Sequence, residues 1–355
     1  MPAEKDRVRM QVLSAVTRAH CTSKTRVKRA FGASKTRVKR AYAKVGWNRI
    51  AFAISLLIIA AASITLFRLL RDIDLDKVVA ALLATTPRTI LLAGLLVAAG
   101  YLTLTFYDYF ALRTIGRRQV PYRIAALSSF TAYTIGHNLG ATVFTGGAVR
   151  LRIYSAWGLG IIDIAKIAFI TGLTFWLGNA FILGLSMAYD PEAASAVDQL
   201  PSWLNRTIAL SGLAVIIGYL IWLLPAPRLI GSGPWQIELP SAPLTFVQIG
   251  IGVMDLTIGG LAMYTLLPGE PAIEFPAFLV TFVLATLLGF LSHTPGSLGV
   301  FDAAMLVGLA QFDKNELLAT LLTFRLVYFM LPFAAALCVL GARELWLNLA
   351  RNEGP

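Results

Sequence analysis

Beyond residue 50 the sequence has no excess of charge and few charged side chains. The chain of 355 residues contains 31 Lys and Arg and 19 Asp and Glu; 14 of the basic and two of the acidic residues lie in residues 1–50, which leaves 17 of each sign. Charged residues make up 14% of the chain, against about 25% in a soluble domain. After residue 50 no long polar stretch is present, so the sequence predicts no soluble domain there.

Cysteine, histidine and recognisable catalytic patterns are also scarce. The two cysteines, Cys21 and Cys338, lie far apart in the sequence and predict neither a disulfide framework nor a metal site. The chain has three histidines, no GxxxxGK[ST] nucleotide-binding motif and no His/Asp/Glu cluster at the spacing of metal ligands. We therefore expect no cofactor, no metal and no use of ATP. Alternating ten-residue strand patterns are absent too, which leaves an all-α fold, because an open sheet cannot lie in lipid.

Long apolar runs are what the sequence has in abundance. Apolar residues make up 57% of the chain and the mean hydropathy is +0.70. About 20 apolar residues span a bilayer as a helix. The runs of about this length are Ile50–Leu70, Thr89–Leu112, Ile161–Ala188, Thr207–Leu224, Leu244–Leu267 and Leu317–Leu340. Two more, Tyr122–Ile135 and Phe275–Leu291, lead directly into glycine-rich sequence. The sequence thus predicts an all-α, polytopic integral membrane protein with about eight membrane segments.

The chain divides into a basic tail at residues 1–49, a membrane domain at residues 50–345 and a short C-terminal tail at residues 346–355. Lys and Arg next to the first membrane helix are retained on the cytoplasmic side. The tail therefore predicts a cytoplasmic N-terminus for a multi-pass protein of the bacterial cytoplasmic membrane. An Arg-rich, acid-poor start also fits a transit peptide. After the first span, Asp72–Thr86 has the apolar spacing of a short helix lying in the membrane interface.

The basic tail contains an internal repeat. Ser23–Phe31 (SKTRVKRAF) recurs as Ser34–Tyr42 (SKTRVKRAY), a period of 11 residues. Eleven residues are close to three helical turns, so the apolar residues of both copies share one face. Residues 23–42 are therefore expected to form a basic amphipathic helix on an anionic membrane surface. The alternative is a disordered basic tail, because blocks of like charge repel. Nucleic-acid binding is not expected, since no fold that presents the basic residues is evident.

Loop charges predict that one apolar segment does not cross the membrane. Arg113–Arg123 contains four arginines and no acid, and should be cytoplasmic, whereas Asp190–Arg206 has no positive bias and is expected outside. An odd number of crossings must separate them, yet two apolar stretches lie between. We therefore expect a broken or re-entrant segment around residues 136–152.

Glycine and proline interrupt the apolar sequence twice. Gly136–Arg152 (GHNLGATVFTGGAVRLR) contains four glycines, which let the backbone leave helical geometry. In the other half, Ser292–Asp302 (SHTPGSLGVFD) contains Pro295, which breaks a helix. His137 and His293 occupy the two breaks. Such paired interruptions in two halves indicate a substrate site near the membrane midplane in transporters, and are compatible with an inverted repeat.

These motifs resemble a known family. GHNLGATVFTGGAVRLRIY and SHTPGSLGVFDAAML, followed by RLVYFMLP at Arg325–Pro332, are similar to the membrane region of the lysylphosphatidylglycerol synthase/flippase family and its short stand-alone relatives. The resemblance covers roughly residues 50–345. It implies a translocating membrane domain without the synthase domain, and a separate lipid-modifying synthase as a partner. Two departures are Ser297, where the family usually has the second Gly of Pro-Gly-Gly, and Asp302, where it usually has Glu.

Arg325 lies well inside the last span, where an unpaired charge is costly. One interpretation is an ion pair that holds helices together, with Asp302 the first candidate partner and Asp255 the second. The other is contact with a lipid phosphate. Asp108 and Lys166 lie near the ends of their apolar runs, and we expect them at the interface, reaching toward water.

Arg150 and Arg152 follow the first break and have no acid nearby in sequence. We expect them to bind an anionic headgroup, because Arg matches phosphate with two hydrogen bonds; the alternative is a cytoplasmic anchor pair. His137 and His293 are expected to satisfy freed backbone groups at the breaks, with proton transfer as the alternative role.

The function that these features favour is phospholipid translocation across the cytoplasmic membrane, the lipid being aminoacylated or otherwise modified, by a protein that is not an enzyme. The alternatives are a membrane enzyme acting on a lipid phosphate and a scaffold for a lipid-biosynthetic partner. The candidate substrate-binding residues are His137, Asn138, Gly146, Gly147, Arg150, Arg152, His293, Pro295, Gly296, Asp302 and Arg325.

Overall fold

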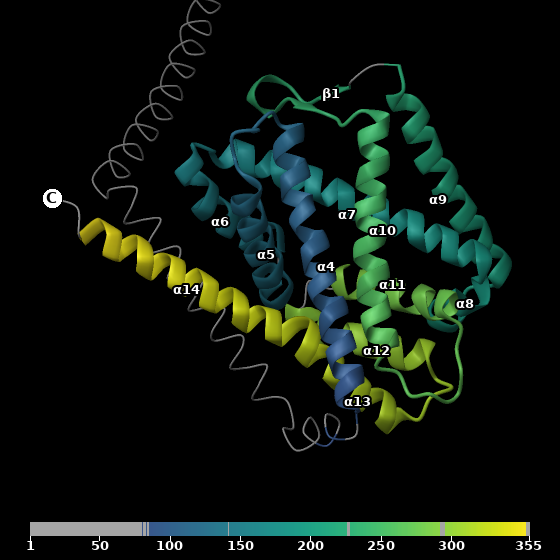
Figure 1. The fold of residues 1–355 in the computed structure, drawn as a ribbon. Helices are drawn as coiled ribbons and strands as arrows, with labels where there is room; N and C mark the ends of the chain where they lie inside the picture. The colour runs from purple at the N-terminus through teal and green to yellow at the C-terminus, as the bar shows by residue number, and fades with distance from the viewer. Residues whose placement is uncertain are drawn as a thin grey trace, which may run out of the picture. The chain divides into compact units, whose positions relative to one another are not determined.

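A computed structural model describes residues 85–140, 142–225, 228–291 and 295–352, together with residues 80 and 83, and these residues form a bundle of helices (Figure 1). The all-α, polytopic prediction is confirmed. Among the described residues, five helices are long and apolar enough to cross a bilayer: Pro87–Thr114, Ile161–Tyr189, Ser202–Leu223, Ala242–Tyr264 and Lys314–Leu345. Each overlaps a run that the sequence predicts as a span.

The first part of the chain, up to the end of the first half of the bundle, contains α4 (Pro87–Thr114), α5 (Tyr122–Leu139), α6 (Thr142–Tyr154), η1 (Ser155–Trp157), α7 (Ile161–Tyr189) and α8 (Pro191–Asp198). The remainder contains α9 (Ser202–Leu223), β1 (Leu229–Ile230), η2 (Gly233–Trp235), β2 (Ile237–Glu238), α10 (Ala242–Tyr264), α11 (Phe275–Leu291), η3 (Pro295–Ser297), α12 (Val300–Gly308), α13 (Lys314–Phe324), η4 (Arg325–Met330) and α14 (Leu331–Asn352).

Some expected features lie outside the described residues. These are the basic tail with its 11-residue repeat, the span Ile50–Leu70, and the interfacial helix Asp72–Thr86 apart from residues 80, 83, 85 and 86. At the other end, α14 continues to Asn352 and so extends into the segment expected as a C-terminal tail.

α5 and α6 form the first of two helical hairpins, hairpin 1. α5 ends at Gly140, whose φ of 74° is open to glycine but costly for most residues. A Cβ on Gly136 would lie 2.7 Å from Thr142 Cγ2, so the chain can fold back this tightly only with glycine there. α5 has 18 residues and α6 has 13, or about 27 Å and 20 Å of helix. The chain therefore folds back where the sequence predicts, and the break is confined to the region around Gly140, since residues 142–154 are helical.

Hairpin 2 consists of α11, η3 and α12, and it repeats the same closure. A Cβ on Gly289 of α11 would lie 2.6 Å from Ser297 Cβ, as Gly136 would from Thr142. The chain reverses through residues with positive φ, Gly296 at 60°, Ser297 at 52° and Gly299 at 79°. The glycine-and-proline signal in the sequence thus marks both turns correctly.

The elements follow the order long helix, hairpin, long helix twice, with α9 between the two sets. The first half is α4, hairpin 1 and α7, and the second is α10, hairpin 2 and the continuous helix from α13 through η4 to α14. α4 and α10 pack side by side and antiparallel, since Gly100 of α4 lies against Ile258 and Tyr107 contacts Asp255 (Figure 1). α5 packs against α14 and α11 packs against α7, so each hairpin contacts a long helix of the other half. This order and packing are compatible with the inverted repeat that the sequence indicates.

The two charged loops lie at opposite ends of α9. A surface hollow is lined by Thr114 and Gly116, which follow α4, and by Gln236 and Glu238 from the connection between α9 and α10. The Arg113–Arg123 loop therefore lies beside the C-terminal end of α9. Asp190–Arg206 lies at its N-terminal end, about 33 Å away for a helix of 22 residues. This separation agrees with the expected placement of the loops on opposite sides.

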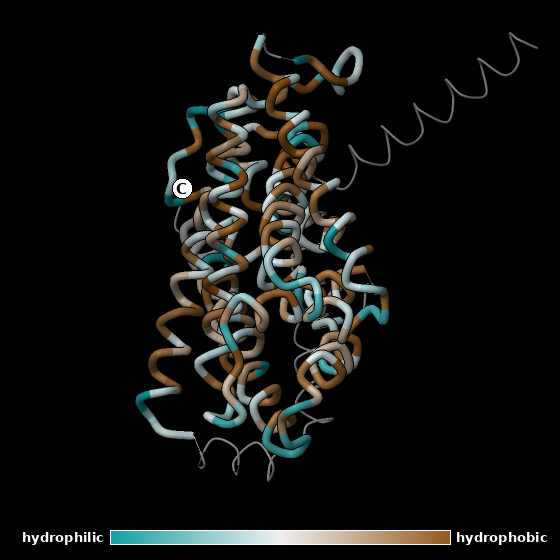
Figure 2. The backbone as a smooth tube through the Cα atoms, turned by 90° about the vertical axis from the view of Figure 1, so that its right-hand side faces the viewer, coloured by the Kyte–Doolittle hydropathy of each residue, from teal (hydrophilic) through white to brown (hydrophobic). Residues whose placement is uncertain are grey.

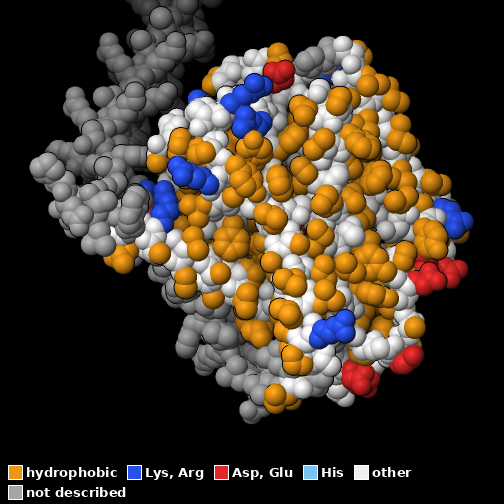
Figure 3. Space-filling model, in the orientation of Figure 1, with side chains coloured by type: hydrophobic (Ala, Val, Ile, Leu, Met, Phe, Trp, Pro, Cys, Tyr) orange, Lys and Arg blue, Asp and Glu red, His pale blue; other side chains and the backbone are white. Residues whose placement is uncertain are grey.

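Hydrophobic side chains cover most of the face seen in Figure 3, and charged side chains gather toward its margins. The backbone coloured by hydropathy shows hydrophobic stretches along the helices and many of the hydrophilic ones in the connections (Figure 2). α9 is the most exposed of the five long helices, with 17% of its apolar window buried. Such a surface suits contact with lipid tails rather than with water.

α7 and α10 cross at a pair of glycines. A Cβ on Gly178 would lie 2.5 Å from the Cα of Gly252, and a Cβ on Gly252 would lie 2.8 Å from the Cα of Gly178 and 2.8 Å from the carbonyl oxygen of Thr174. Near the crossing, Gln248 Nε2 donates to Thr174 Oγ1 at 2.8 Å. Small residues let membrane helices approach this closely and gain packing energy.

We expect Gly252→Ala to lower the folded fraction in detergent by about 1–3 kcal/mol, because the added methyl group overpacks a backbone contact. The matched control is Gly250→Ala, on the same helix, where an added Cβ meets nothing within 4 Å. There Ala should be neutral or stabilising by up to about 1 kcal/mol, since Ala favours helix over Gly. Thermal unfolding followed by size-exclusion chromatography measures both, and equal stabilities for the two variants would contradict the close crossing.

Candidate functional site

The two hairpins and the long helices of both halves enclose a cavity of about 180 Å³. α4, α5, α6, α7, α10, α11, α12, α13 and η4 all contribute to its wall, as does Ser297 from the turn of hairpin 2, but α9 does not. The lining residues are Leu104, Tyr107, Tyr133, His137, Gly140, Thr142, Val143, Phe144, Phe175, Asp255, Leu256, Gly259, Phe282, Thr286, Gly289, Phe290, Ser297, Phe301, Phe324, Tyr328 and Phe329.

The mouth of the cavity lies at the turn of hairpin 1. Val143 and Phe144 line the cavity and are nevertheless 64% and 80% exposed. Side chains that both line a cavity and face outward mark an opening, and here the opening is bordered by apolar residues. A molecule with an apolar part outside and a polar part inside fits this geometry.

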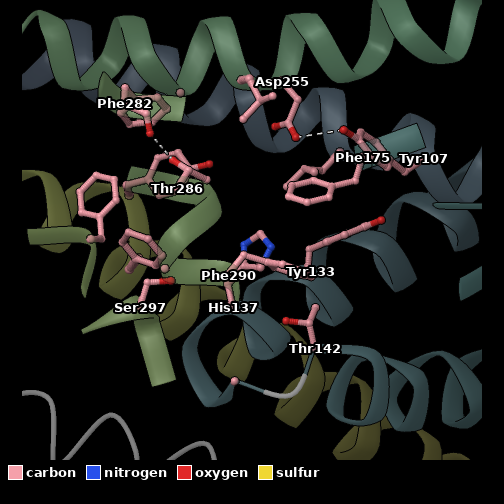
Figure 4. A pocket seen from close by; sticks show the side chains of 18 of the residues that line it. Tyr107, Tyr133, His137, Thr142, Phe175, Asp255, Phe282, Thr286, Phe290 and Ser297 are labelled. Carbon is pink, nitrogen blue, oxygen red and sulfur yellow. Dashed lines mark hydrogen bonds between the residues drawn. The ribbon is translucent and has the colours of Figure 1, made fainter. Parts of the chain in front are cut away.

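Aromatic rings form most of the interior wall, and a few polar groups project between them (Figure 4). Asp255 of α10 accepts a hydrogen bond from the Tyr107 hydroxyl of α4 at 3.2 Å. His137 and Tyr133 come from successive turns of α5, with ring centroids 5.8 Å apart. Across the cavity, Thr286 donates to the carbonyl of Phe282 within α11 at 2.8 Å. Ligand sites commonly combine an apolar wall with a small number of such polar groups.

A π-helical turn, η4, contributes Tyr328 and Phe329 to the cavity wall. Such a turn inserts one extra residue into an α-helix and is frequently found at functional sites. Two carbonyl groups of this turn accept hydrogen bonds from the other half of the molecule. Tyr101 donates to the Tyr328 carbonyl at 3.1 Å, and Asn138 Nδ2 donates to the Phe329 carbonyl at 3.4 Å. These bonds position the Tyr328 and Phe329 rings that face the cavity.

A buried ion pair links α6 of hairpin 1 to α4. Arg150 donates to both carboxylate oxygens of Asp108, with Nη2 2.7 Å from Oδ1 and Nε 3.0 Å from Oδ2. The Tyr154 hydroxyl donates to the same carboxylate at 2.8 Å, and the Tyr133 ring lies 4.8 Å from the guanidinium. Asp108 has no exposed side-chain surface. Asp108 therefore does not reach toward water as the sequence predicts, because hairpin 1 covers the end of α4 on which it lies.

The second ion pair lies within the other half and confirms the first candidate partner of Arg325. Its Nη2 lies 2.6 Å from Asp302 Oδ2 and its Nε lies 3.0 Å from Oδ1. Nη1 donates to the Gly296 carbonyl at 3.0 Å, inside the turn of hairpin 2. Asp302 also accepts from the Gly299 amide at 3.1 Å, where α12 begins. Arg325 therefore fastens both the turn and the second helix of hairpin 2 to the crossing helix.

The remaining predicted residues occupy varied places. Arg152 pairs with Glu344 of α14 at 2.6 Å. Asn138 is fully buried between α5 and η4 and does not line the cavity. Gly146 packs against the Ala132 carbonyl, whereas an added Cβ on Gly147 would meet nothing within 4 Å.

The cavity brings together few of the residues that sequence reasoning selected. Of those described, His137 lines it directly. Gly296, Asp302 and Arg325 shape the turn that carries Ser297, and Pro295 begins that turn and is exposed. His293 lies outside the described residues. The arginines expected to receive a headgroup are all engaged in ion pairs, so direct headgroup contact by them stays a prediction.

Sequence reasoning missed Asp255 and the aromatic wall as cavity residues. Asp255 was the second candidate partner of Arg325, but it contacts Tyr107 instead. The available signal was its position in α10, 13 residues from the first residue and nine from the last. An ionisable residue at such a depth in a membrane helix is a candidate functional group by default.

Known proteins match most of this chain. An uncharacterized protein of Synechocystis is 30% identical over 251 residues, which cover 70% of this chain and 78% of that protein. The inner membrane protein YbhN of Escherichia coli is 27% identical over 251 residues, covering 68% of this chain and 76% of YbhN. The phosphatidylglycerol lysyltransferase of Staphylococcus xylosus is 26% identical over 304 residues, which are 81% of this chain but 33% of that protein. No family model matches the chain.

Proposed function

Because this chain belongs to the family of multi-pass inner membrane proteins that includes the Synechocystis protein and YbhN, and is related to the membrane region of phosphatidylglycerol lysyltransferases, we propose that it moves phospholipid between the two leaflets of the membrane. The protein acts as a transporter and not as an enzyme. Among the described residues no group of three His, Cys, Asp or Glu side chains could hold a metal ion. A membrane enzyme acting on a lipid phosphate is the alternative function.

The observation that carries the proposal is the cavity between the two hairpins. It lies inside a bundle with an apolar surface, its mouth is bordered by Val143 and Phe144, and its interior contains Asp255, Tyr107 and His137. A phospholipid needs this combination in order to cross. Its polar headgroup is shielded from the hydrocarbon core inside the cavity, while its acyl chains remain in lipid outside the mouth.

The proposed substrate is a phospholipid carrying an aminoacyl or other modification. This substrate class is suggested by the relatives named phosphatidylglycerol lysyltransferase. This chain matches a third of their length. A separate lipid-modifying synthase would supply the substrate. The proposed orientation places the basic N-terminal tail and the Arg113–Arg123 loop in the cytoplasm, with residues 23–42 on the anionic surface of the membrane.

Filling the cavity should stop transport without unfolding the protein. Thr286 lines the cavity and its hydroxyl bonds only within its own helix among the described contacts. We expect Thr286→Trp, reconstituted in vesicles with a fluorescent headgroup-labelled phospholipid, to reduce transbilayer movement at least tenfold. The measurement is the fraction of label that a membrane-impermeant quencher reaches over time.

Leu288→Trp is the matched control. Leu288 lies on the same helix, two residues away, and is 43% exposed on the outer surface. This variant should keep wild-type transport, because a Trp there faces lipid. If wild-type vesicles move label no faster than protein-free vesicles, or if Thr286→Trp moves it as fast as Leu288→Trp at equal protein content, the proposed function is wrong.

A further inference from the structure

Asp255 is the buried carboxylate in the membrane bundle whose charge nothing in the described part of the chain neutralises. Asp108 and Asp302 each receive two hydrogen bonds from an arginine. Asp255 is 8% exposed and has no ion pair among the described residues. An ionised carboxylate in an apolar site is strongly unfavourable without a compensating positive charge. Within the described part of the chain, that positive charge is therefore left to a proton or a cation in the cavity.

Tyr107, the hydrogen-bond partner of Asp255, can bond to the carboxyl group in either protonation state. A tyrosine hydroxyl can donate a hydrogen bond to an ionised carboxylate and can accept one from a protonated carboxyl group. Tyr107 is 1% exposed and lies 3.2 Å from Asp255 Oδ2, so it is held in place for either role. Arg150 and Arg325 have only donors, so each can serve Asp108 or Asp302 only as a donor. The hydroxyl partner therefore distinguishes Asp255 from the two carboxylates that are paired with arginine.

The surroundings of Asp255 favour a proton over a metal cation. A hard cation such as Na⁺ or Ca²⁺ needs several oxygen ligands, and the described cavity supplies one carboxylate and scattered hydroxyls. α7, α11 and α13 present Phe175, Phe290 and Phe324 to the cavity, none of which titrates. The titratable groups around Asp255 are Tyr101 and Tyr107 of α4, Tyr133 and His137 of α5 and Tyr328 of η4, with the Asp108–Arg150 pair beyond them.

We propose that Asp255 is the proton-binding group of the cavity and that it couples lipid movement to the proton gradient. The inference rests on the proposed function. With the cavity open to the acidic side, a proton binds a carboxyl oxygen of Asp255. With the cavity open to the alkaline side, the proton passes to water, and the Tyr107 O–H donates to the carboxylate that remains. One proton crosses for each cycle, and no bond other than O–H forms or breaks.

Protonation of Asp255 can be observed without any transport. Infrared difference spectra of the purified full chain between acidic and alkaline pH should contain the C=O stretching band of a protonated carboxylic acid, and Asp255→Asn should lose that band. Glu192→Gln, which changes an exposed carboxylate in α8, should keep it. Persistence of the band in Asp255→Asn overturns the assignment. If Asp255→Asn does not fold, Tyr107→Phe replaces it, and an unchanged pH dependence of the band in that variant overturns the role of the pair.

Coupling is measured in vesicles with fluorescent phospholipid and an imposed pH difference. One proton for each lipid should shift the ratio of label between the leaflets about tenfold for each pH unit. Asp255→Asn should show no such shift, at whatever rate label still moves. A wild-type ratio that ignores the pH difference overturns the coupling. Lipid movement that is lost in Asp255→Asn, while the wild type shows neither the carboxylic acid band nor the pH-dependent shift, would also overturn the coupling. That result would indicate that Asp255 binds a cationic headgroup. The band without any lipid movement would refute the proposed function and leave the proton site standing.

Discussion

Replacing Asp108 with Ala should lower the free energy of unfolding by about 3–5 kcal/mol, because removal of one partner leaves the other charge buried and unpaired. The pair is shielded from solvent, with 4% of the Arg150 side chain and none of the Asp108 side chain exposed. We expect the loss as a lower folded fraction in titrations with SDS. The double change Asp108→Ala with Arg150→Ala should recover part of it, since no uncompensated charge then remains.

Arg117 provides the matched comparison. It pairs with Asp163 at 3.0 Å, but its side chain is 38% exposed. Arg117→Ala should therefore cost no more than about 1 kcal/mol. Equal losses for Arg117→Ala and Asp108→Ala would contradict the energetic importance of burial. Arg150→Gln, which would test headgroup contact by Arg150, breaks the same buried pair. Its transport should therefore be compared with that of wild type at equal amounts of folded protein.

Arg325→Ala should also lower the free energy of unfolding by about 3–5 kcal/mol. In this ion pair, however, removing either partner should not have the same effect. Arg325 holds Asp302 and two carbonyl groups in the turn of hairpin 2, those of Gly296 and Ser297. Asp302→Ala should therefore cost less, because the guanidinium keeps both carbonyl groups. Arg325→Lys should restore stability only in part, since one ammonium group cannot reproduce the planar array of donors. The folded fraction after heating in detergent measures all three.

The double variant Asp302→Ala with Arg325→Ala tests whether the two residues act as a pair. Residues in direct contact give coupling energies of about 0.5–3 kcal/mol in such cycles. Losses that add strictly would show that the ion pair contributes nothing beyond its separate parts. A coupling within that range would support its role in fastening hairpin 2.

The long helices and the hairpin turns were predictable because their signals are local. Apolar length fixes a span, and α11 has the bounds Phe275–Leu291 that its apolar run predicts. Glycines at Gly140 and Gly296 mark the turns because positive φ is open to glycine at little cost. The two charged loops are expected on opposite sides, yet two apolar stretches lie between them, and this indicated that one segment folds back. Each of these inferences needs only a short window of sequence.

The ion pairs and the cavity were harder to predict because they depend on packing between distant segments. Arg150 and Asp108 are 42 positions apart, and only the fold of hairpin 1 against α4 brings them together. Arg325 could be matched with Asp302 because one charge deep in a span demands another, and few acids were available. Asp255 has no charged partner in the described residues, and matching charges in the sequence named it only as the second candidate partner of Arg325. Its role follows from the cavity, which a sequence does not display.

The π-helical turn shifts the register of the last crossing helix. Before it, Leu317, Leu321 and Phe324 are buried at the spacing of a regular helix. Continued at 3.6 residues per turn, that stripe would pass, beyond the turn, through Leu331, Ala335 and Cys338, all of which are exposed. The buried residues are instead Phe333, Ala336 and Leu340.

One inserted residue thus sets which side of α14 meets the bundle. Deleting one residue between Arg325 and Met330 would let the turn close as a regular α-helix. Phe333, Ala336 and Leu340 would still face the bundle, because the deletion moves each of them back onto the regular spacing of the stripe before the turn. Among homologous chains, a one-residue gap at this place would therefore mark members that lack the π-helical turn but pack their last helix by the same face.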